Sequence, residues 1–178
     1  MSAYPQAYID YLVYFHAERD YFECHEVMEE YWKEHPGDPL ASNYVGLIQI
    51  AVALYHHRRN NLTGAKKMLA SSLNNLTDTG MNSLGIHSEE LRTRIAARLE
   101  QLSQPDSVYE DMNLPLSDPR LAAACMAECA QKGKTWLGSI DTSDTFLIHK
   151  HRLRDRSSVL HEREQSRLRK AEQRGMEP

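Results

Sequence analysis

The residues with the clearest chemical potential lie in one short run, YFECHEVMEEYW, at residues 21–32. His25 and Glu29 are four residues apart, so on a helix one imidazole and one carboxylate can touch. A carboxylate in that position fixes the tautomer of a histidine or raises its basicity. Glu26 follows His25 directly, and two further histidines stand at 56–57. This set of side chains has the chemistry for ligand binding, metal coordination or acid–base catalysis.

Three interpretations of the set are open. In the first, its members satisfy one another in a buried core network that fixes how the helices pack, because buried polar groups are normally paired. That network would comprise His25, Glu29, Gln49 and His56. In the second, the same side chains line a small ligand or peptide site among aromatic residues. The aromatic neighbours would be Tyr21, Trp32 and Tyr55. In the third, the chain is a metal-dependent, hydrolase-like enzyme using His25 and Glu29, with His56 as a further candidate metal ligand.

The known metal motifs fit the sequence poorly. The HExxE run at 25–29 lacks the second histidine of HExxH zinc proteases, and the paired ExxH of di-iron bundles is missing. Arg19 and His25 fit a loose arginine–histidine ribonuclease spacing, but so short a pattern arises easily by chance. No Gly-rich phosphate loop is present. We therefore assign no catalytic residue and no cofactor, and the sequence favours a non-catalytic binding role.

The segment that must position these residues is Tyr44–Tyr55, YVGLIQIAVALY, in which eleven of twelve residues are apolar or glycine. A helix that is apolar all round lies inside a bundle, and twelve such residues are too few for a membrane span. Gln49 and His56 lie two turns apart on one side of this helix. If it packs antiparallel to the helix of His25, the two polar stripes meet.

The remaining helices follow from periodicity and from start and stop signals. We expect helices over Tyr4–Glu18, from Asp20 to the Pro36–Gly37 stop, and from Asp38 as N-cap with Pro39 to Arg59. Others should follow Thr63 with an apolar stripe to Leu76, run from Ser88 to Leu102, and run from Asp118 to near Gly133. In the fifth, Leu91, Ile95, Leu99 and Leu102 should face inward, and Arg92, Arg94 and Arg98 should stay in solvent. Ser103–Ser117 is expected to be a loop.

Charge and cysteine content limit the classes of protein to which the chain can belong. Residues 149–178 carry +4 and residues 1–148 carry −8, so an acidic body precedes a basic tail. An acidic body argues against nucleic-acid binding, which only the tail could support weakly. The three cysteines, Cys24, Cys125 and Cys129, indicate reduced structural thiols. Met1–Asp10 does not resemble a signal peptide, so a cytoplasmic protein is expected.

Two long segments carry a family resemblance: YFECHEVMEEYWK, and GLIQIAVALYHHRRNNLTGAKKML after it. Over about residues 11–76 the chain resembles the bacterial and archaeal family known as domain of unknown function 309. Cys24 and Met28 depart from its usual alanine and its usual tryptophan or leucine. The resemblance implies a helical fold similar to helix-hairpin repeats and no settled activity. It also implies that these residues belong to a shared signature: His25, Glu26, Glu29, Gly46, Gln49, His56, Asn61 and Gly64.

Together these observations predict an all-α, antiparallel helical bundle over residues 1–133, with a repeat-like helix-hairpin N-terminal half. Residues 134–178 should form a charged extension, partly helical or disordered. The expected partner is a small molecule or a protein, with no membrane involvement. The candidate contact residues are His25, Glu26, Glu29, Trp32, Gln49 and His56.

Overall fold

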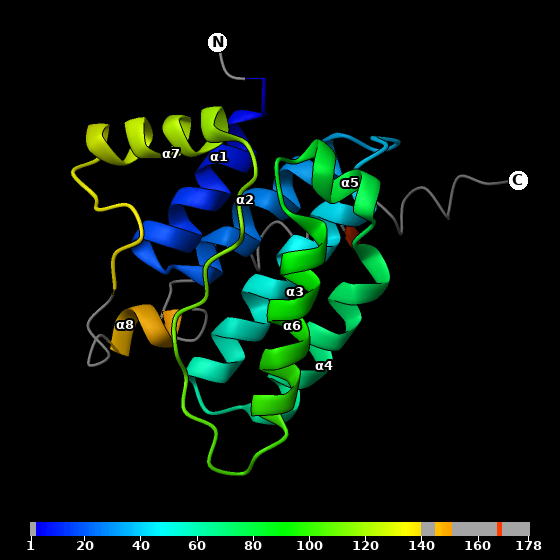
Figure 1. The fold of residues 1–178 in the computed structure, drawn as a ribbon, viewed down its shortest axis with the longest axis vertical. Helices are drawn as coiled ribbons and strands as arrows, with labels where there is room; N and C mark the ends of the chain where they lie inside the picture. Colours follow the sequence, from blue (N-terminus) through cyan, green and yellow to red (C-terminus); the bar gives the residue numbers. More distant parts are fainter. Residues whose placement is uncertain (1–2, 140–144, 151–166, 169–178) are drawn as a thin grey trace, which may run out of the picture. The chain divides into compact units, whose positions relative to one another are not determined.

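A computed structural model of the chain describes residues 3–139, 145–150, 167 and 168. The chain divides into two compact units, Met1–Ile148 and His149–Pro178. The first unit is helical, which confirms the predicted all-α class (Figure 1). Its elements are α1 (Gln6–Val13), the π-helix η1 (Tyr14–Glu18), α2 (Tyr21–Glu34), α3 (Ala41–Arg58), α4 (Leu62–Asn75), α5 (Asp78–Ser83), α6 (Ser88–Leu102), α7 (Pro119–Gln131) and α8 (Thr145–Ile148).

Several helix ends follow the expected capping chemistry. The Asp20 carboxylate accepts the Glu23 N–H at the start of α2, and the Asp118 carboxylate accepts the Arg120 N–H at the start of α7. Beyond α2 the chain turns at Gly37, whose φ is +87°, and beyond α7 at Gly133, whose φ is +67°. These boundaries agree with the sequence predictions.

Other predicted helix boundaries were wrong. Asp38 does not cap α3: its side chain accepts the Leu40 N–H, and the chain makes one more turn before the helix begins at Ala41. Asn61 caps α4, which therefore starts at Leu62. Ser88 is the first residue of α6 and not its cap. The short α5 was not predicted.

The first predicted helix divides in two because its end is wound as a π-helix. Arg19 adopts a left-handed φ of 49°, and the Asp20 N–H bonds back to the Tyr14 carbonyl at 2.9 Å. This wider turn places the Arg19 side chain in the interior of the bundle instead of on its surface. Arg19 is only 2% exposed.

The helices α2, α3 and α4 form two antiparallel hairpins. Phe22 at the start of α2 lies near Tyr55 at the end of α3, while Tyr31 and Tyr44 meet at the opposite ends with ring centres 5.5 Å apart. On the other side of α3, Gly46 lets α4 come close, because an added Cβ there would lie 2.7 Å from the Leu76 side chain. The predicted helix-hairpin arrangement is therefore present.

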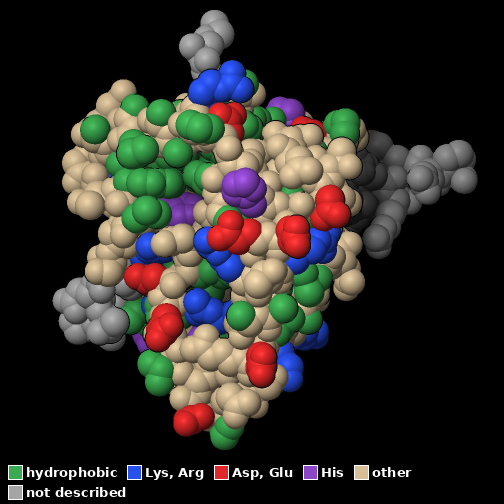
Figure 2. Space-filling view, viewed as in Figure 1, with side chains coloured by type: hydrophobic (Ala, Val, Ile, Leu, Met, Phe, Trp, Pro, Cys, Tyr) green, Lys and Arg blue, Asp and Glu red, His purple; other side chains and the backbone are tan. Residues whose placement is uncertain are grey.

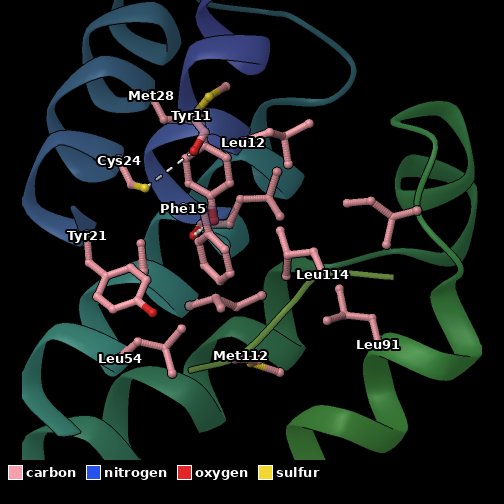
Figure 3. Close-up of a cluster of buried hydrophobic side chains, with 14 of the residues drawn as sticks. Tyr11, Leu12, Phe15, Tyr21, Cys24, Met28, Leu54, Leu91, Met112 and Leu114 are labelled. Carbon is pink, nitrogen blue, oxygen red and sulfur yellow. Dashed lines mark hydrogen bonds between the residues drawn. The ribbon is translucent and has the colours of Figure 1, made fainter. Parts of the chain in front are cut away.

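The core lies between the first two helices, α3, α6 and the 103–117 segment. Figure 3 shows its aromatic and aliphatic side chains interleaved, with the Cys24 thiol donating to the Tyr11 carbonyl at 3.4 Å. Leu91 and Ile95 of α6 are buried as predicted, but Arg98, which we expected in solvent, is only 9% exposed. The reason is packing of the 103–117 segment over α6.

The 103–117 segment lacks helix but is not a free loop. It supplies buried Met112 and Leu114 to the core, and an antiparallel bridge links Leu116 to Ile86. Beyond α7, Trp136 packs against His16 with ring centres 4.8 Å apart. Trp136 and Gly138, which fall within the predicted extension of residues 134–178, therefore contact His16 and Arg19 of the first unit.

Helix α7 presents an apolar outer face. Figure 2 shows hydrophobic side chains gathered over the α7 end of the visible face and charged side chains spread over the rest. Met126 on this face is 48% exposed, while Cys125 and Cys129 are buried. None of the described helices is both long and apolar enough to cross a membrane. The predicted character of the tail from 151 onward lies outside the described residues, apart from 167 and 168.

Candidate functional site

The protein contains two polar clusters. The first is the one that the sequence predicts. It runs along one side of α2, where Phe22, His25, Glu29 and Trp32 recur at spacings of three and four residues, with Glu26 beside them. We call these five residues the α2 stripe.

His25 lies at the centre of the α2 stripe with a carboxylate at each ring nitrogen. Its Nε2 is 2.7 Å from a Glu29 oxygen, and its Nδ1 is 3.4 Å from a Glu26 oxygen. Lys33 holds the other Glu29 oxygen at 2.7 Å. The side chains of His25 and Glu29 are 31% and 30% exposed. The predicted pair therefore forms, but at the surface and not inside the core.

Gln49 and His56 have partners of their own. Asn75 of α4 donates to the Gln49 side-chain oxygen at 2.8 Å, and Asn61 donates to His56 Nδ1 at 3.3 Å. Partial burial and the nearby Arg59 lower the pKa of His56 below its ordinary value. The four residues of the predicted network are therefore not joined by the hydrogen bonds of one buried network.

Aromatic contacts nevertheless connect the two helices. The Phe22 ring centre lies 6.3 Å from that of His25 and 6.5 Å from that of Tyr55, which lies 6.1 Å from His56. The guanidinium of Arg59 lies over the Tyr55 ring at 5.1 Å. The α2 stripe thus continues across α3 through tilted and edge-to-face ring contacts.

Trp32, one of the predicted contact residues, lies on the outer side of α2. It is 36% exposed, whereas Cys24 and Met28 are fully buried. Trp32 is three residues from Glu29 and seven from His25, so it lies on the outer side with them. An exposed tryptophan therefore lies next to the charged side chains of the α2 stripe.

Three residues of the family signature serve packing and capping. Gly46 admits α4 against α3, as described above. The Asn61 side chain accepts the Gly64 N–H at 3.0 Å, which caps α4, and a Cβ at Gly64 would lie 2.6 Å from the Asn61 amide. The signature therefore contains structural positions as well as the His25 group.

The second cluster is partly buried and was not predicted. We call it the arginine cluster: Arg19, Tyr21, Arg58, Arg98 and Tyr109, with His57, Ser107 and Asp111 around them. Three donors of Arg19 reach the Gly138 carbonyl, the Met112 carbonyl and the Asn113 side chain at 2.8–2.9 Å. Asp111 approaches the same guanidinium at 3.7 Å. The Arg19 guanidinium is buried and hydrogen-bonded, whereas His25 lies on the surface. The two side chains therefore do not form the arginine–histidine pair of the ribonuclease spacing.

Tyrosines form the centre of the arginine cluster. The hydroxyls of Tyr21 and Tyr109 hydrogen-bond to each other, and Tyr109 donates to Asp111 at 2.7 Å. Burial raises the pKa of Tyr21 to about 12 and that of Tyr109 still further, so both hydroxyls stay neutral. Figure 3 shows Tyr21 extending from α2 beneath the core, on the side of Leu54.

Arg98 and His57 complete the arginine cluster. Arg98 donates to the Glu110 carbonyl at 2.7 Å and lies 3.3 Å from His57 Nδ1. Burial, with the adjacent Arg98 charge, lowers the pKa of His57 to about 4. His57 Nε2 then faces Ser107 at 3.0 Å. A sequence signal for Arg98 did exist: it falls on the same helical stripe as Leu91, Ile95 and Leu102.

Two depressions in the described part of the chain lie away from the α2 stripe. One, of about 510 Å³, is lined by α5–α6 residues including His87 and Glu90. The other, of about 440 Å³, lies against α4 and the end of α6, beside Lys66 and Lys67. In the same residues, no group of three or more histidine, cysteine, aspartate or glutamate side chains is arranged to hold a metal ion.

Comparison with known proteins gives a family and a relative. The model of the family described as "Domain of unknown function (DUF309)" matches residues 8–68, from α1 into α4. The "Uncharacterized protein YpuF" of Bacillus subtilis (strain 168) is 49% identical over 163 residues, which cover 90% of this chain and 93% of that protein. No solved structure matches the chain. The matched family region includes the whole α2 stripe.

Proposed function

Because this chain belongs to the DUF309 family, whose description names no activity, we propose a function from the geometry: it is a cytoplasmic, non-catalytic binding module. Its recognition surface is the α2 stripe, continued across α3 by Tyr55 and His56. Its partner is another protein. The observation that carries this proposal is the exposure of Trp32 beside the half-exposed His25–Glu29 pair.

Trp32 supplies the anchor expected of a protein–protein contact. Tryptophan is enriched among the residues that dominate binding energy, because it buries a large area and also donates a hydrogen bond. At 36% exposure its ring is available at the surface, while Tyr31 beside it stacks on His35 at 4.0 Å. A partner that covers Trp32 would remove apolar area from water at little cost in side-chain order.

The charge around the α2 stripe favours a basic partner segment. Helix α2 carries five glutamates against one lysine, Lys33. Opposite charge on the partner would speed association and select against acidic competitors. We therefore expect a segment with lysine or arginine next to an apolar side chain that covers Trp32.

The same geometry favours a protein over a small molecule. Small-molecule sites are concave and enclose most of their ligand. The α2 stripe lines neither of the two depressions described above. A half-exposed helix face with an aromatic anchor fits a macromolecular surface better.

The metal-dependent alternative has no geometric support beyond the pair itself. A catalytic zinc site needs three protein ligands, and the described residues provide no group of three. His25 and Glu29 instead pair with each other, and Glu29 also pairs with Lys33. Elemental analysis of untagged protein still tests this alternative, since stoichiometric metal would support it.

The binding proposal is tested by photo-crosslinking in cells that express the full chain. A benzophenone amino acid at position 32 should capture a defined protein, whereas the same probe at Val108, a 72% exposed position on a different segment, should not. Replacing Glu26 and Glu29 by lysine should cut the yield at position 32 severalfold. Equal capture at both positions, or capture at neither, would contradict the proposal.

A further inference from the structure

Arg58, at the end of α3, is an arginine of the arginine cluster with donors left over. Its Nη1 donates to the Arg19 carbonyl at 2.7 Å. Its Nε and Nη2 are buried and have no hydrogen-bond partner within the part of the chain that the structure describes. No other buried side-chain nitrogen or oxygen atom in the described part of the chain lacks a hydrogen-bond partner.

Buried, unpaired donors on a charged group are costly. Burying a polar group without a hydrogen bond costs about 1–3 kcal/mol, and more for a charged one, so proteins pair nearly all of them. An exception calls for a specific explanation, such as an ion or ligand that occupies the site in solution.

The two donors define the shape of the missing acceptor. In a guanidinium, Nε–H and one Nη2–H point the same way from one edge of the planar group. This edge is the fork that binds the two oxygens of a carboxylate or a phosphate in parallel hydrogen bonds. A water molecule satisfies such a fork less completely than an oxyanion, which accepts both bonds and carries the opposite charge.

The surroundings of Arg58 favour an anion. Its guanidinium lies 4.7 Å from the Tyr21 ring centre and 5.8 Å from that of Tyr109, so aromatic faces hold it in place. Arg19 and Arg98 add two more positive charges. Against these stand the carboxylates of Asp111, Glu110 and the α2 cap residue Asp20, none of which is hydrogen-bonded to the Nε or Nη2 of Arg58.

His57 does not add to that charge. Arg98 is a donor at His57 Nδ1, so Nδ1 is the acceptor nitrogen, and Nε2–H then donates to the Ser107 hydroxyl. The histidine is therefore held as the neutral tautomer. It ties the arginine cluster to the 103–117 segment without competing for an anion.

The 103–117 segment controls access to Arg58. Tyr109 covers the guanidinium from this segment, while its neighbour Val108 is 72% exposed. The segment is attached near this point by side-chain hydrogen bonds from Tyr21, His57 and Arg98. A movement of Tyr109 outward would open an approach to the Arg58 guanidinium without unfolding a helix.

We propose that the Nε–Nη2 edge of Arg58 is a binding site for an oxyanion, the carboxylate or phosphate group of a ligand, and that Tyr109 closes over it. This site is independent of the α2 stripe and of the function proposed for it. It assigns to the end of α3 a chemistry that the family description does not contain.

The test is a titration followed by NMR on the full chain with ¹⁵N-labelled arginine. Sodium phosphate and sodium acetate are added separately, with sodium chloride at equal ionic strength as the reference. The Arg58 Nε–H signal should shift in a saturable way with one or both oxyanions. A shift with phosphate alone identifies a phosphate site, one with acetate alone a carboxylate site, and shifts with both a general oxyanion site.

Two substitutions make the result specific. Arg58→Lys keeps the charge but removes the fork, and should weaken the apparent affinity about tenfold or more, as judged by the oxyanion-dependent rise in melting temperature. Arg92→Lys is the matched control: Arg92 is already paired with Asp78 and the Leu76 carbonyl, so this variant should keep the wild-type rise.

The proposal is overturned if neither oxyanion moves the Arg58 signal beyond the chloride reference, or if Arg58→Lys retains the full rise in melting temperature. Should Arg58→Lys fail to fold, the wild-type titration decides alone. Tyr109→Ala gives an independent check, because opening the cover should speed the association rate severalfold, while Val108→Ala should leave it unchanged.

Discussion

The α2 stripe and the arginine cluster both contain histidine, charge and aromatic rings, yet they differ in burial. His25 and Glu29 have about a third of their side-chain surface in water. Arg19 is 2% exposed and His57 is likewise 2% exposed. The same residue types therefore stand in two different dielectric environments only a few helical turns apart in sequence.

This difference separates recognition from stability. An exposed ion pair contributes little to folding, because water screens it and two side chains must be ordered. A buried guanidinium whose donors are all paired is costly to disturb, because its loss leaves several acceptors unsatisfied. We therefore expect substitutions in the arginine cluster to affect stability, and substitutions in the α2 stripe to affect binding.

The largest effect is expected for Arg19→Met, which keeps an apolar stem and removes the donors. The carbonyls of Met112 and Gly138 and the side chain of Asn113 would each lose a hydrogen bond. The free energy of unfolding, measured by urea titration, should fall by about 3 kcal/mol or more.

Arg92→Met is the control for that prediction. Arg92 pairs with Asp78 near the surface, where its side chain is 36% exposed, so the expected loss is below about 1 kcal/mol. Equal losses for the two variants would remove the contrast between a buried and an exposed arginine.

The next effect is a pH dependence through His16, which lies beside the arginine cluster. Its Nδ1–H donates to the Leu12 carbonyl, and its Nε2 accepts the Leu114 N–H. Burial lowers its pKa to about 3, so the folded protein keeps it neutral while the unfolded chain protonates below about pH 6.5. Stability should be full above pH 6.5, fall as the pH drops toward 3, and level off below that.

The slope from His16 approaches about 1.4 kcal/mol per pH unit, or about 1.5 kcal/mol between pH 6.5 and pH 5. Urea titrations of wild type and His16→Gln across this window isolate it, because the carboxylates contribute equally to both proteins. His16→Gln should be less stable at pH 7 but flatter with pH. Parallel pH curves for the two proteins would show that folding does not lower the pKa of His16.

A smaller effect is expected for Tyr109→Phe. The substitution keeps the ring over Arg58 but removes the hydroxyl between Tyr21 and Asp111. A loss of about 1–2 kcal/mol in the free energy of unfolding is expected, because the buried Tyr21 hydroxyl and the partly buried Asp111 carboxylate each lose a partner. Val108→Ala on the same segment should cost below about 0.5 kcal/mol. An equally small loss for Tyr109→Phe would show that the hydroxyls of Tyr21 and Tyr109 are exposed to solvent.

Much of the helical fold could be predicted because its boundaries have local causes. Asp20, Asp118, Gly37 and Gly133 act within a few residues of themselves, and the apolar run at Tyr44–Tyr55 identifies α3 without any knowledge of the rest. The π-helical turn before Arg19 could not be predicted in this way. Its cause is a tertiary one, since Arg19 turns inward to reach Met112 and Gly138.

The same distinction between local and tertiary causes applies to the two sites. The His25–Glu29 contact follows from helical spacing alone and is present at 2.7 Å. Its exposure, the outward position of Trp32 and the burial of Arg98 depend on which segment covers which helix face. For Arg98 the covering segment is 103–117, whose sequence has no periodic pattern that would indicate packing.

The α2 stripe is expected to serve recognition and not folding. The most direct measurement is the free energy of unfolding of His25→Ala, Glu29→Gln and the double variant at pH 7. Each single change should cost about 0.5 kcal/mol or less, with a small coupling typical of an exposed i, i+4 pair. Losses of about 1–3 kcal/mol for each single change, with the double variant losing far less than their sum, would show a buried network and contradict the account.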